Sequence, residues 1–182
     1  MNYIPLILLI VVAAWFVAVY NKLIRLRNLV KNAWRQIDVQ LKRRHDLIPN
    51  LVEVVKDYMA YEQETLTKVI EARSAAVNAR GTGAQGKAEN FLTESLKSLL
   101  AVVESYPELK ANKNVAALQE ELTGTENKIS FARQFFNDTV MSYNNLIQTI
   151  PSNIIASIFC FRQEEYFQIE DEARAVPKAS LR

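Results

Sequence analysis

Cysteine, histidine and glycine are all scarce in this sequence of 182 residues, which has one Cys, one His and four Gly. A single cysteine excludes an internal disulfide and a thiolate metal cluster. A single histidine argues against a zinc site or a His-ligated di-iron centre, because such sites draw on several His or Cys ligands. We therefore expect no bound metal and no cofactor. Four glycines support few tight turns, so the composition favours long helices over a turn-rich β fold.

Charged residues are absent before Lys22, and residues 3–20 are apolar apart from Pro5. Eighteen helical residues extend roughly 27 Å, which approaches the hydrocarbon thickness of a bilayer. A cleaved signal peptide is the alternative, but it requires a basic N-terminal region and a small-residue cleavage site, and this stretch has neither. We therefore predict a single transmembrane helix over residues 1–21.

The flanking charge predicts the orientation of this helix. Residues 22–44 contain eight basic side chains and one acidic one, a net charge of +7. Because basic residues beside a membrane helix stay on the cytoplasmic side, the N-terminus is expected outside and the rest of the chain in the cytoplasm. The protein is thus predicted to cross the cytoplasmic membrane once. Nucleic-acid binding is not expected, since the whole chain has a net charge of only +2.

Apolar residues recur at helical spacing after the anchor and predict a long helix that continues to about Met59. Proline removes a helical hydrogen bond, so the helix is expected either to kink near His45–Pro49 or to break there, with Asp46 capping a new helix. A second helix is predicted over 62–80. The following GTGAQG, residues 81–86, is predicted to be a loop. A third helix is predicted over 91–106.

The last helix has the most regular pattern. Its apolar and threonine positions alternate spacings of three and four over five heptads, which is typical of coiled-coil packing. These positions are Val115, Leu118, Leu122, Thr125, Ile129, Ala132, Phe136, Thr139, Tyr143, Leu146 and Ile150. Pro151 is expected to end the helix. No useful β-type alternation occurs, so the fold class is predicted to be all-α.

Helix lengths suggest how the elements assemble. The outer helices, 22–59 and 113–150, each have 38 residues, or roughly 57 Å, and the middle two are about half as long. We expect an antiparallel up-and-down four-helix bundle of two long and two short helices over residues 22–150. The tail, 151–182, begins apolar. It is expected either to lie in the membrane interface or to pack on the bundle, and to fray beyond about Phe167.

The segment KRRHD, Lys42 to Asp46, is the most conspicuous candidate site. Arg44 falls on the apolar stripe beside His45, where an unpaired charge would be costly. Antiparallel long helices would bring it within a turn of Glu126. The candidate site therefore consists of Lys42, Arg43, Arg44, His45, Asp46, Glu126 and Asn127, acting either as a buried polar layer that sets helix register or as a partner-binding surface. Catalysis by His45 and Asp46 is not expected, because no nucleophile or substrate pocket is indicated.

The sequence contains the blocks YNKL at 20–23, AW at 33–34, DVQLKRRHDLIPNLV at 38–52, LKAN at 109–112, LQEEL at 118–122, TEN at 125–127, AR at 132–133, FN at 136–137 and YN at 143–144. Together these blocks resemble the LemA family of bacterial membrane proteins. The resemblance implies a single-pass anchor and a four-helix bundle, and no established activity. One branch of the family is associated with building magnetosome membranes. Cys160, which we expect to be a small buried hydrophobe, stands where the family usually has glycine.

Two functional classes follow. The first is a membrane-anchored helical scaffold or adaptor, without catalytic activity, that organises membrane-associated assemblies. The second is an enzyme, or a regulatory subunit, acting on membrane proteins or lipid. The missing catalytic constellations favour the first. Near the membrane only two helices would pack together, which would leave Trp34, Phe131 and Phe135 poorly covered. These residues are candidate contacts of a homo-oligomer, and other membrane proteins are possible partners.

Overall fold

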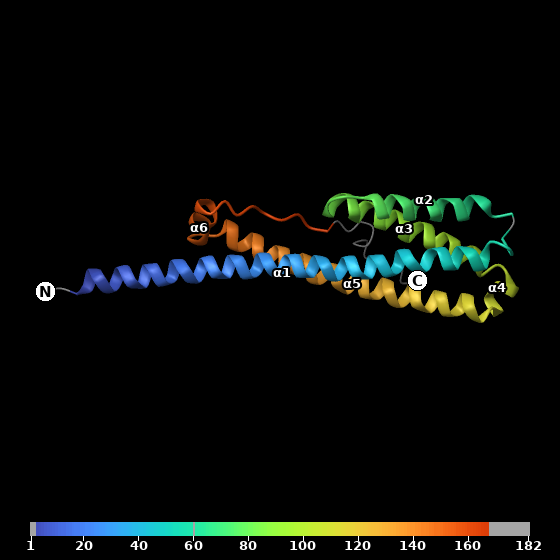
Figure 1. The fold of residues 1–182 in the computed structure, drawn as a ribbon, viewed down its shortest axis with the longest axis horizontal. Coiled ribbons are helices and arrows are strands. Elements are labelled where there is room, and N and C mark those ends of the chain that lie inside the picture. Colours follow the sequence, from blue (N-terminus) through green and yellow to red (C-terminus); the bar gives the residue numbers. More distant parts are fainter. Residues whose placement is uncertain (1–2, 60, 168–182) are drawn as a thin grey trace, which may run out of the picture. The chain divides into compact units, whose positions relative to one another are not determined.

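A computed structural model describes residues 3–59 and 61–167 of the chain, and in these residues every regular element is a helix (Figure 1). The all-α prediction is confirmed. The helices are α1 (Ile4–Val55), α2 (Gln63–Asn78), α3 (Thr82–Val103), α4 (Pro107–Ala111), α5 (Lys113–Gln148) and α6 (Ser152–Ile158).

Helix α1 runs without interruption through Pro49, so the predicted alternative of a break at Asp46 is wrong. Pro49 has no N–H to donate to the carbonyl of His45, four residues earlier. Arg73 of α2 supplies the missing donor, with its Nε 2.7 Å from that carbonyl oxygen. The N-terminal part of α1 is long and apolar enough to cross a membrane, and none of its most apolar stretch is buried.

The chain divides into two compact units. One contains the described residues up to Val39 together with Ile129–Tyr166, and the other contains Gln40–Lys128 except residue 60, with Phe167. Helices α1 and α5 each contribute a segment to both units. The domain boundaries inferred from the sequence remain predictions.

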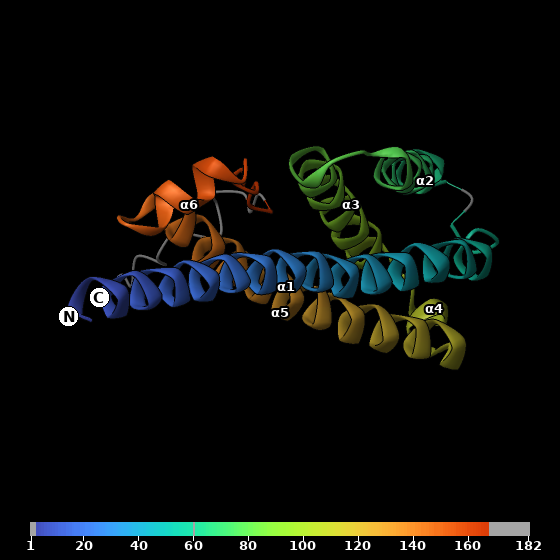
Figure 2. The ribbon, with the colours of Figure 1, turned by 60° about the vertical axis from the view of Figure 1, so that its left-hand side comes forward.

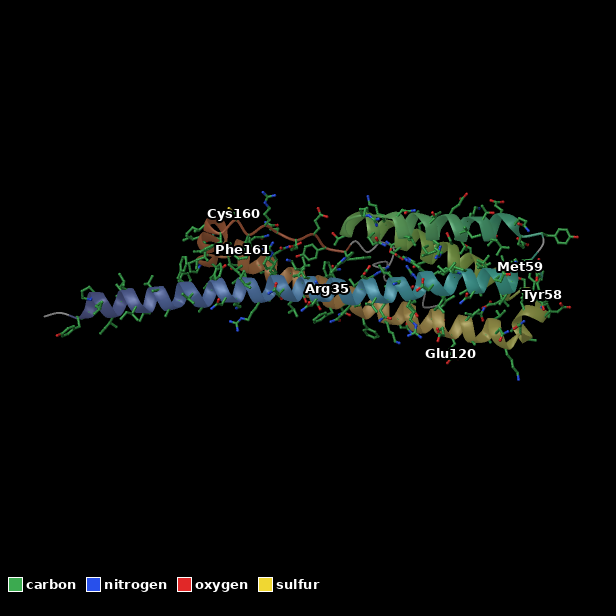
Figure 3. The ribbon with its side chains drawn as sticks, in the orientation of Figure 1. Arg35, Tyr58, Met59, Glu120, Cys160 and Phe161 are labelled. Atoms are coloured by element: carbon green, nitrogen blue, oxygen red, sulfur yellow. The ribbon has the colours of Figure 1, made fainter. Side chains whose placement is uncertain are left out.

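In the second unit, buried apolar side chains from α1 through α5 form one hydrophobic core. Helices α2 and α3 lie side by side in both ribbon views (Figure 2). After α1 ends, the chain turns and returns Met59 to the core, while its neighbour Tyr58 stays exposed (Figure 3). The core therefore extends past the C-terminal end of α1 to include Met59.

The predicted loop at residues 81–86 is wrong, because α3 already begins at Thr82. Only Gly81 has a turn conformation, with a φ of 84° that other residues rarely adopt. Gln85 secures this first turn by donating to the Ala76 carbonyl of α2 at 3.0 Å. A tertiary contact thus overrides the weak helix propensity of the glycines.

A short helix that the sequence did not indicate, α4, separates α3 from α5. Pro107 begins it, a position where the missing N–H costs nothing. Asn112 then caps α5, because its Oδ1 accepts from the Asn114 N–H at 2.9 Å and from the Val115 N–H at 3.4 Å. Helix α5 ends three residues before Pro151, as its pattern indicated. The Ile150–Pro151 peptide bond is cis.

In the first unit, α6 ends in a turn at Cys160, which has a φ of 53°. The Cys160 N–H bonds to the Ser157 carbonyl at 3.1 Å and the Phe161 N–H to the Ala156 carbonyl at 2.9 Å. This pair of bonds is the Schellman arrangement, whose left-handed residue is usually glycine. Cys160 is exposed rather than buried, contrary to expectation (Figure 3).

Candidate functional site

Arg44 lies on the buried stripe of α1, three residues after Leu41 and four before Ile48, and only 1% of it is exposed. The same periodicity that buries its apolar neighbours therefore buries a permanent positive charge. Such a charge is tolerated in an interior only when it is paired and hydrogen-bonded. The surrounding helices must then supply acceptors.

The acceptors come from α3 and α5. Arg44 Nη2 donates to a carboxylate oxygen of Glu89, forming an ion pair between two fully buried side chains. Arg44 Nη1 donates to Glu126 Oε2 at 2.5 Å and to Thr93 Oγ1 at 2.9 Å. Among the described residues, the Nε of Arg44 is buried without a hydrogen-bond partner. The guanidinium thus binds together three helices of the second unit.

Glu89 is the centre of this cluster. Besides Arg44, its carboxylate contacts His45 Nε2 and Gln85 Nε2, each at 2.8 Å from Oε1. Burial by itself raises the pKa of Glu89, but the hydrogen bond from His45 and the charge of Arg44 outweigh that effect. The pKa therefore lies below its ordinary value, and Glu89 is an anion at neutral pH.

The other predicted site residues lie at the surface. Lys42, Asp46 and Asn127 are exposed, and Arg43 forms a half-exposed ion pair with Glu121 at 3.2 Å. Exposed pairs of this kind contribute at most about 1 kcal/mol. Of the seven predicted site residues, Arg44, His45 and Glu126 therefore belong to one connected network, which Glu89 completes.

Glu89 was absent from the predicted site, although a signal for it existed. The buried residues of α3 alternate spacings of three and four, as Leu92, Leu96 and Leu99 do. Extending this series backwards by three residues from Leu92 reaches Glu89. The predicted third helix begins at Phe91, because the glycines upstream predict a loop, and it therefore does not reach Glu89.

A pocket of about 190 Å³ opens beside the cluster between α3 and α5. Its apolar wall consists of Leu96, Leu100 and Leu122, and Arg44 and Glu126 form part of its lining. Among the described residues, no group of three or more His, Cys, Asp or Glu side chains is arranged to hold a metal ion. Chemically, the cluster is a network of paired charges beside an apolar hollow.

The predicted oligomer residues lie in the first unit. Phe131 and Phe135 are one turn apart on α5 and are 74% and 44% exposed. Trp34 of α1 is half-buried, and its ring lies edge-on to that of Phe136 with centroids 5.5 Å apart. Two large aromatic side chains on the same side of α5 thus remain uncovered.

The described residues define an all-helical protein with an apolar N-terminal helix segment and a buried ionic cluster. The model of the LemA family matches residues 33–180. The chain belongs to the LemA family.

Curated relatives support this membership. Magnetosome protein MamQ of Magnetospirillum gryphiswaldense is 24% identical over 174 residues, covering 81% of this chain and 64% of the relative. Protein LemA of Metamycoplasma hominis is 26% identical over 155 residues, covering 85% of this chain and 71% of the relative. The chain thus spans somewhat less than two thirds of the length of the MamQ relative.

Proposed function

We propose that this protein is a membrane-anchored helical scaffold that assembles through an aromatic face formed by Trp34, Phe131 and Phe135. The observation that carries the proposal is the exposure of Phe131 and Phe135, one turn apart on α5. Burying one such side chain contributes on the order of 1.5–3 kcal/mol. Anchoring in a membrane raises the effective concentration of identical chains, so a modest contact suffices for assembly.

The anchor is the apolar N-terminal part of α1. Its length, its composition and its complete exposure support insertion in a bilayer. The basic residues that follow it support an external N-terminus, with the helical part in the cytoplasm at the cytoplasmic membrane. Relatives named as magnetosome proteins are consistent with a role in organising membranes.

The finer architecture is also part of the proposal. Residues 22–150 form an antiparallel up-and-down bundle, in which α2 and α3 are the short helices and parts of α1 and α5 the long ones. The hydrophobic core that α1 through α5 form in the second unit supports it over residues 48–122. The Arg44 cluster acts as a polar layer that sets their register, the best-attested role of buried ionic groups. Catalysis is not assigned to it, because both carboxylate oxygens of Glu89 and both terminal nitrogens of Arg44 are already bonded to neighbouring side chains.

Size analysis in mild detergent tests the scaffold. The wild-type chain is expected to form oligomers, and Phe135→Glu is expected to disperse them without loss of helix content. Ile70→Glu is the matched control, because Ile70 on α2 is about as exposed but lies outside the aromatic face. A wild-type chain that remains monomeric at all concentrations would contradict self-assembly.

Cysteine accessibility in intact cells tests the orientation. In a Cys160→Ser background, a cysteine at the exposed position Ala84 should resist a membrane-impermeant thiol reagent until the cells are permeabilised. A cysteine at Tyr3 should react in intact cells and serves as the positive control. Ready labelling at position 84 in intact cells would reverse the proposed orientation.

A further inference from the structure

The C-terminal part of the first unit contains a second uncharged segment. Residues 146–161 have no Asp, Glu, Lys or Arg, and Arg162 follows directly. This mirrors the N-terminal part of the chain, where the uncharged stretch ends immediately before Lys22. Each uncharged segment is therefore followed by a basic residue at its boundary, and Glu164 and Glu165 come two and three residues after Arg162.

Aromatic contacts bring these two boundaries together. The ring of Phe159 lies against those of Tyr20 and Phe16, with centroids 4.6 and 5.9 Å apart. The ring of Phe161 lies 6.1 Å from that of Tyr20. The end of α6 thus contacts the last turn of the apolar stretch of α1, and tyrosine is a residue that favours the membrane–water boundary.

Part of the surface of α6 and of the residue that follows it is apolar and uncovered. Ile155 and Ala156 are buried, but Ile154 and Ile158 are 59% and 61% exposed, and Phe159 remains partly exposed as well. Ile154 and Ile158 are four residues apart and share one side of the helix. Exposed apolar side chains gathered in this way mark contact with protein or lipid.

The segment is held firmly in this place. The Asn144 side chain of α5 donates to the Glu164 carbonyl at 2.9 Å and accepts from the Glu164 N–H at 3.0 Å. Together with the two hydrogen bonds that close α6, this pair of bonds holds the chain on both sides of Phe161. The uncovered face of α6 is therefore a fixed surface rather than a frayed end.

We propose that Ile154, Ile158 and Phe159 insert into the headgroup region of the bilayer that α1 spans, giving the protein a second membrane contact. This inference rests on the proposed anchor. Phe159 contacts Phe16, which is four residues, or about 6 Å, below Tyr20 along α1. Interfacial helices typically bury their apolar faces to about 5–10 Å, so the depths agree. Lys22 and Arg162 then lie at the level of the lipid phosphates.

The native Cys160 offers a direct test, because it is exposed at the end of α6 and is the only cysteine of the chain. The full chain is labelled there with an environment-sensitive NBD fluorophore and reconstituted in phosphatidylcholine–phosphatidylglycerol vesicles. The quenching of its emission is then measured with lipids that carry a nitroxide either at the headgroup or near the end of the acyl chain. We expect a blue-shifted emission, and the headgroup nitroxide should remove more of it than the deep one.

Two reference positions, each in a Cys160→Ser background, make the result interpretable. A label introduced by Ser98→Cys, at an exposed position of α3 away from the aromatic face, should emit as in water and resist both quenchers. A label at Val12, inside the apolar stretch, should respond best to the deep nitroxide. A Val12 label that lipid nitroxides do not quench would contradict the anchor itself. A quenched Val12 label together with an unquenched Cys160 label would overturn only the second contact. A blue-shifted Cys160 label that resists lipid nitroxides would also overturn it, because protein would then cover α6.

Substitution of the inserted residues provides a second measurement. Ile154→Asn combined with Ile158→Asn should return the Cys160 label to a water-like emission and abolish its quenching, with helix content unchanged. Met141→Asn, at a similarly exposed apolar position of α5, should leave both signals as in the wild type. An unchanged Cys160 signal in the double variant would overturn the proposal.

Discussion

The Nε of Arg73 donates a hydrogen bond to the backbone carbonyl of His45, although the two residues belong to different helices. That carbonyl would otherwise accept from residue 49, and residue 49 is a proline. A side chain from α2 therefore replaces the hydrogen bond that Pro49 removes from α1. This contact explains why α1 continues through the proline, and it fastens α2 beside the Arg44 cluster.

The first prediction follows from this replacement. Arg73→Met should lower the free energy of unfolding by about 1–3 kcal/mol, because it leaves a partly buried carbonyl without a donor. Pro49→Ala restores a backbone N–H, so the same Arg73→Met substitution should cost clearly less in the Pro49→Ala background. Urea unfolding in detergent, followed by far-UV circular dichroism, provides the four values of the double-mutant cycle.

Arg80→Met is the control for this cycle, because exposed Arg80 bonds, within the part of the chain that the structure describes, only to the carbonyl of its neighbour Ala79. Its effect should be small and the same in both backgrounds. Equal costs of Arg73→Met with and without Pro49 would mean that the two residues do not act on the same carbonyl.

The second prediction separates the two acidic partners of Arg44. The Glu89 side chain is fully buried, whereas 39% of the Glu126 side chain is exposed. Glu89→Gln should therefore destabilise the fold by about 3–5 kcal/mol, the range for breaking a buried pair. Glu126→Gln should cost much less, because water can solvate its end of the network and Glu89 still neutralises Arg44. Equal losses in urea unfolding would contradict this ranking.

The third prediction concerns acid. Burial raises the pKa of Glu89, but His45 and Arg44 together lower it by more than burial raises it. The folded-state pKa therefore lies below the ordinary value of 4.5. A carboxyl with a lowered folded-state pKa contributes stability above its unfolded-state pKa and loses it as the pH falls through the folded-state value. Stability should thus decrease below about pH 4.5, and Glu89→Gln should weaken this decrease. Urea midpoints measured across that range test it, and identical pH profiles would contradict the role of Glu89.

The fourth prediction concerns the turn after α6. Cys160 has a left-handed backbone conformation that costs a non-glycine residue about 1–2 kcal/mol. Cys160→Gly should remove this cost and raise the thermal midpoint. The entropy that glycine adds to the unfolded chain offsets part of this stabilisation. Ser157→Gly, inside α6, has no such conformation to relieve and should lower the midpoint. A lower midpoint for Cys160→Gly would show that the Cys160 side chain stabilises the fold by more than its backbone conformation destabilises it.

Local sequence patterns were sufficient for much of this fold. The helical spacing of apolar residues located α1, α2 and α5 to within a few residues, because that spacing reflects which side of a helix faces the core. The same stripe identified Arg44 as a buried charge. The uncharged stretch before Lys22 marked the candidate membrane span, since bilayer thickness sets the necessary length directly.

Tertiary structure alone decided the features that depend on groups distant in the sequence. Residues 82–86 have a weak local preference for a helix, and the hydrogen bond from Gln85 to α2 stabilises them as the first turn of α3. Pro49 could have ended α1, and Arg73 of another helix makes its continuation tolerable. Glu89 is a buried partner of Arg44 because α3 begins early enough, at Thr82, to include it. In each case a side chain from one helix satisfies a backbone or charged group of another, and such pairings depend on packing rather than on the pattern of either segment.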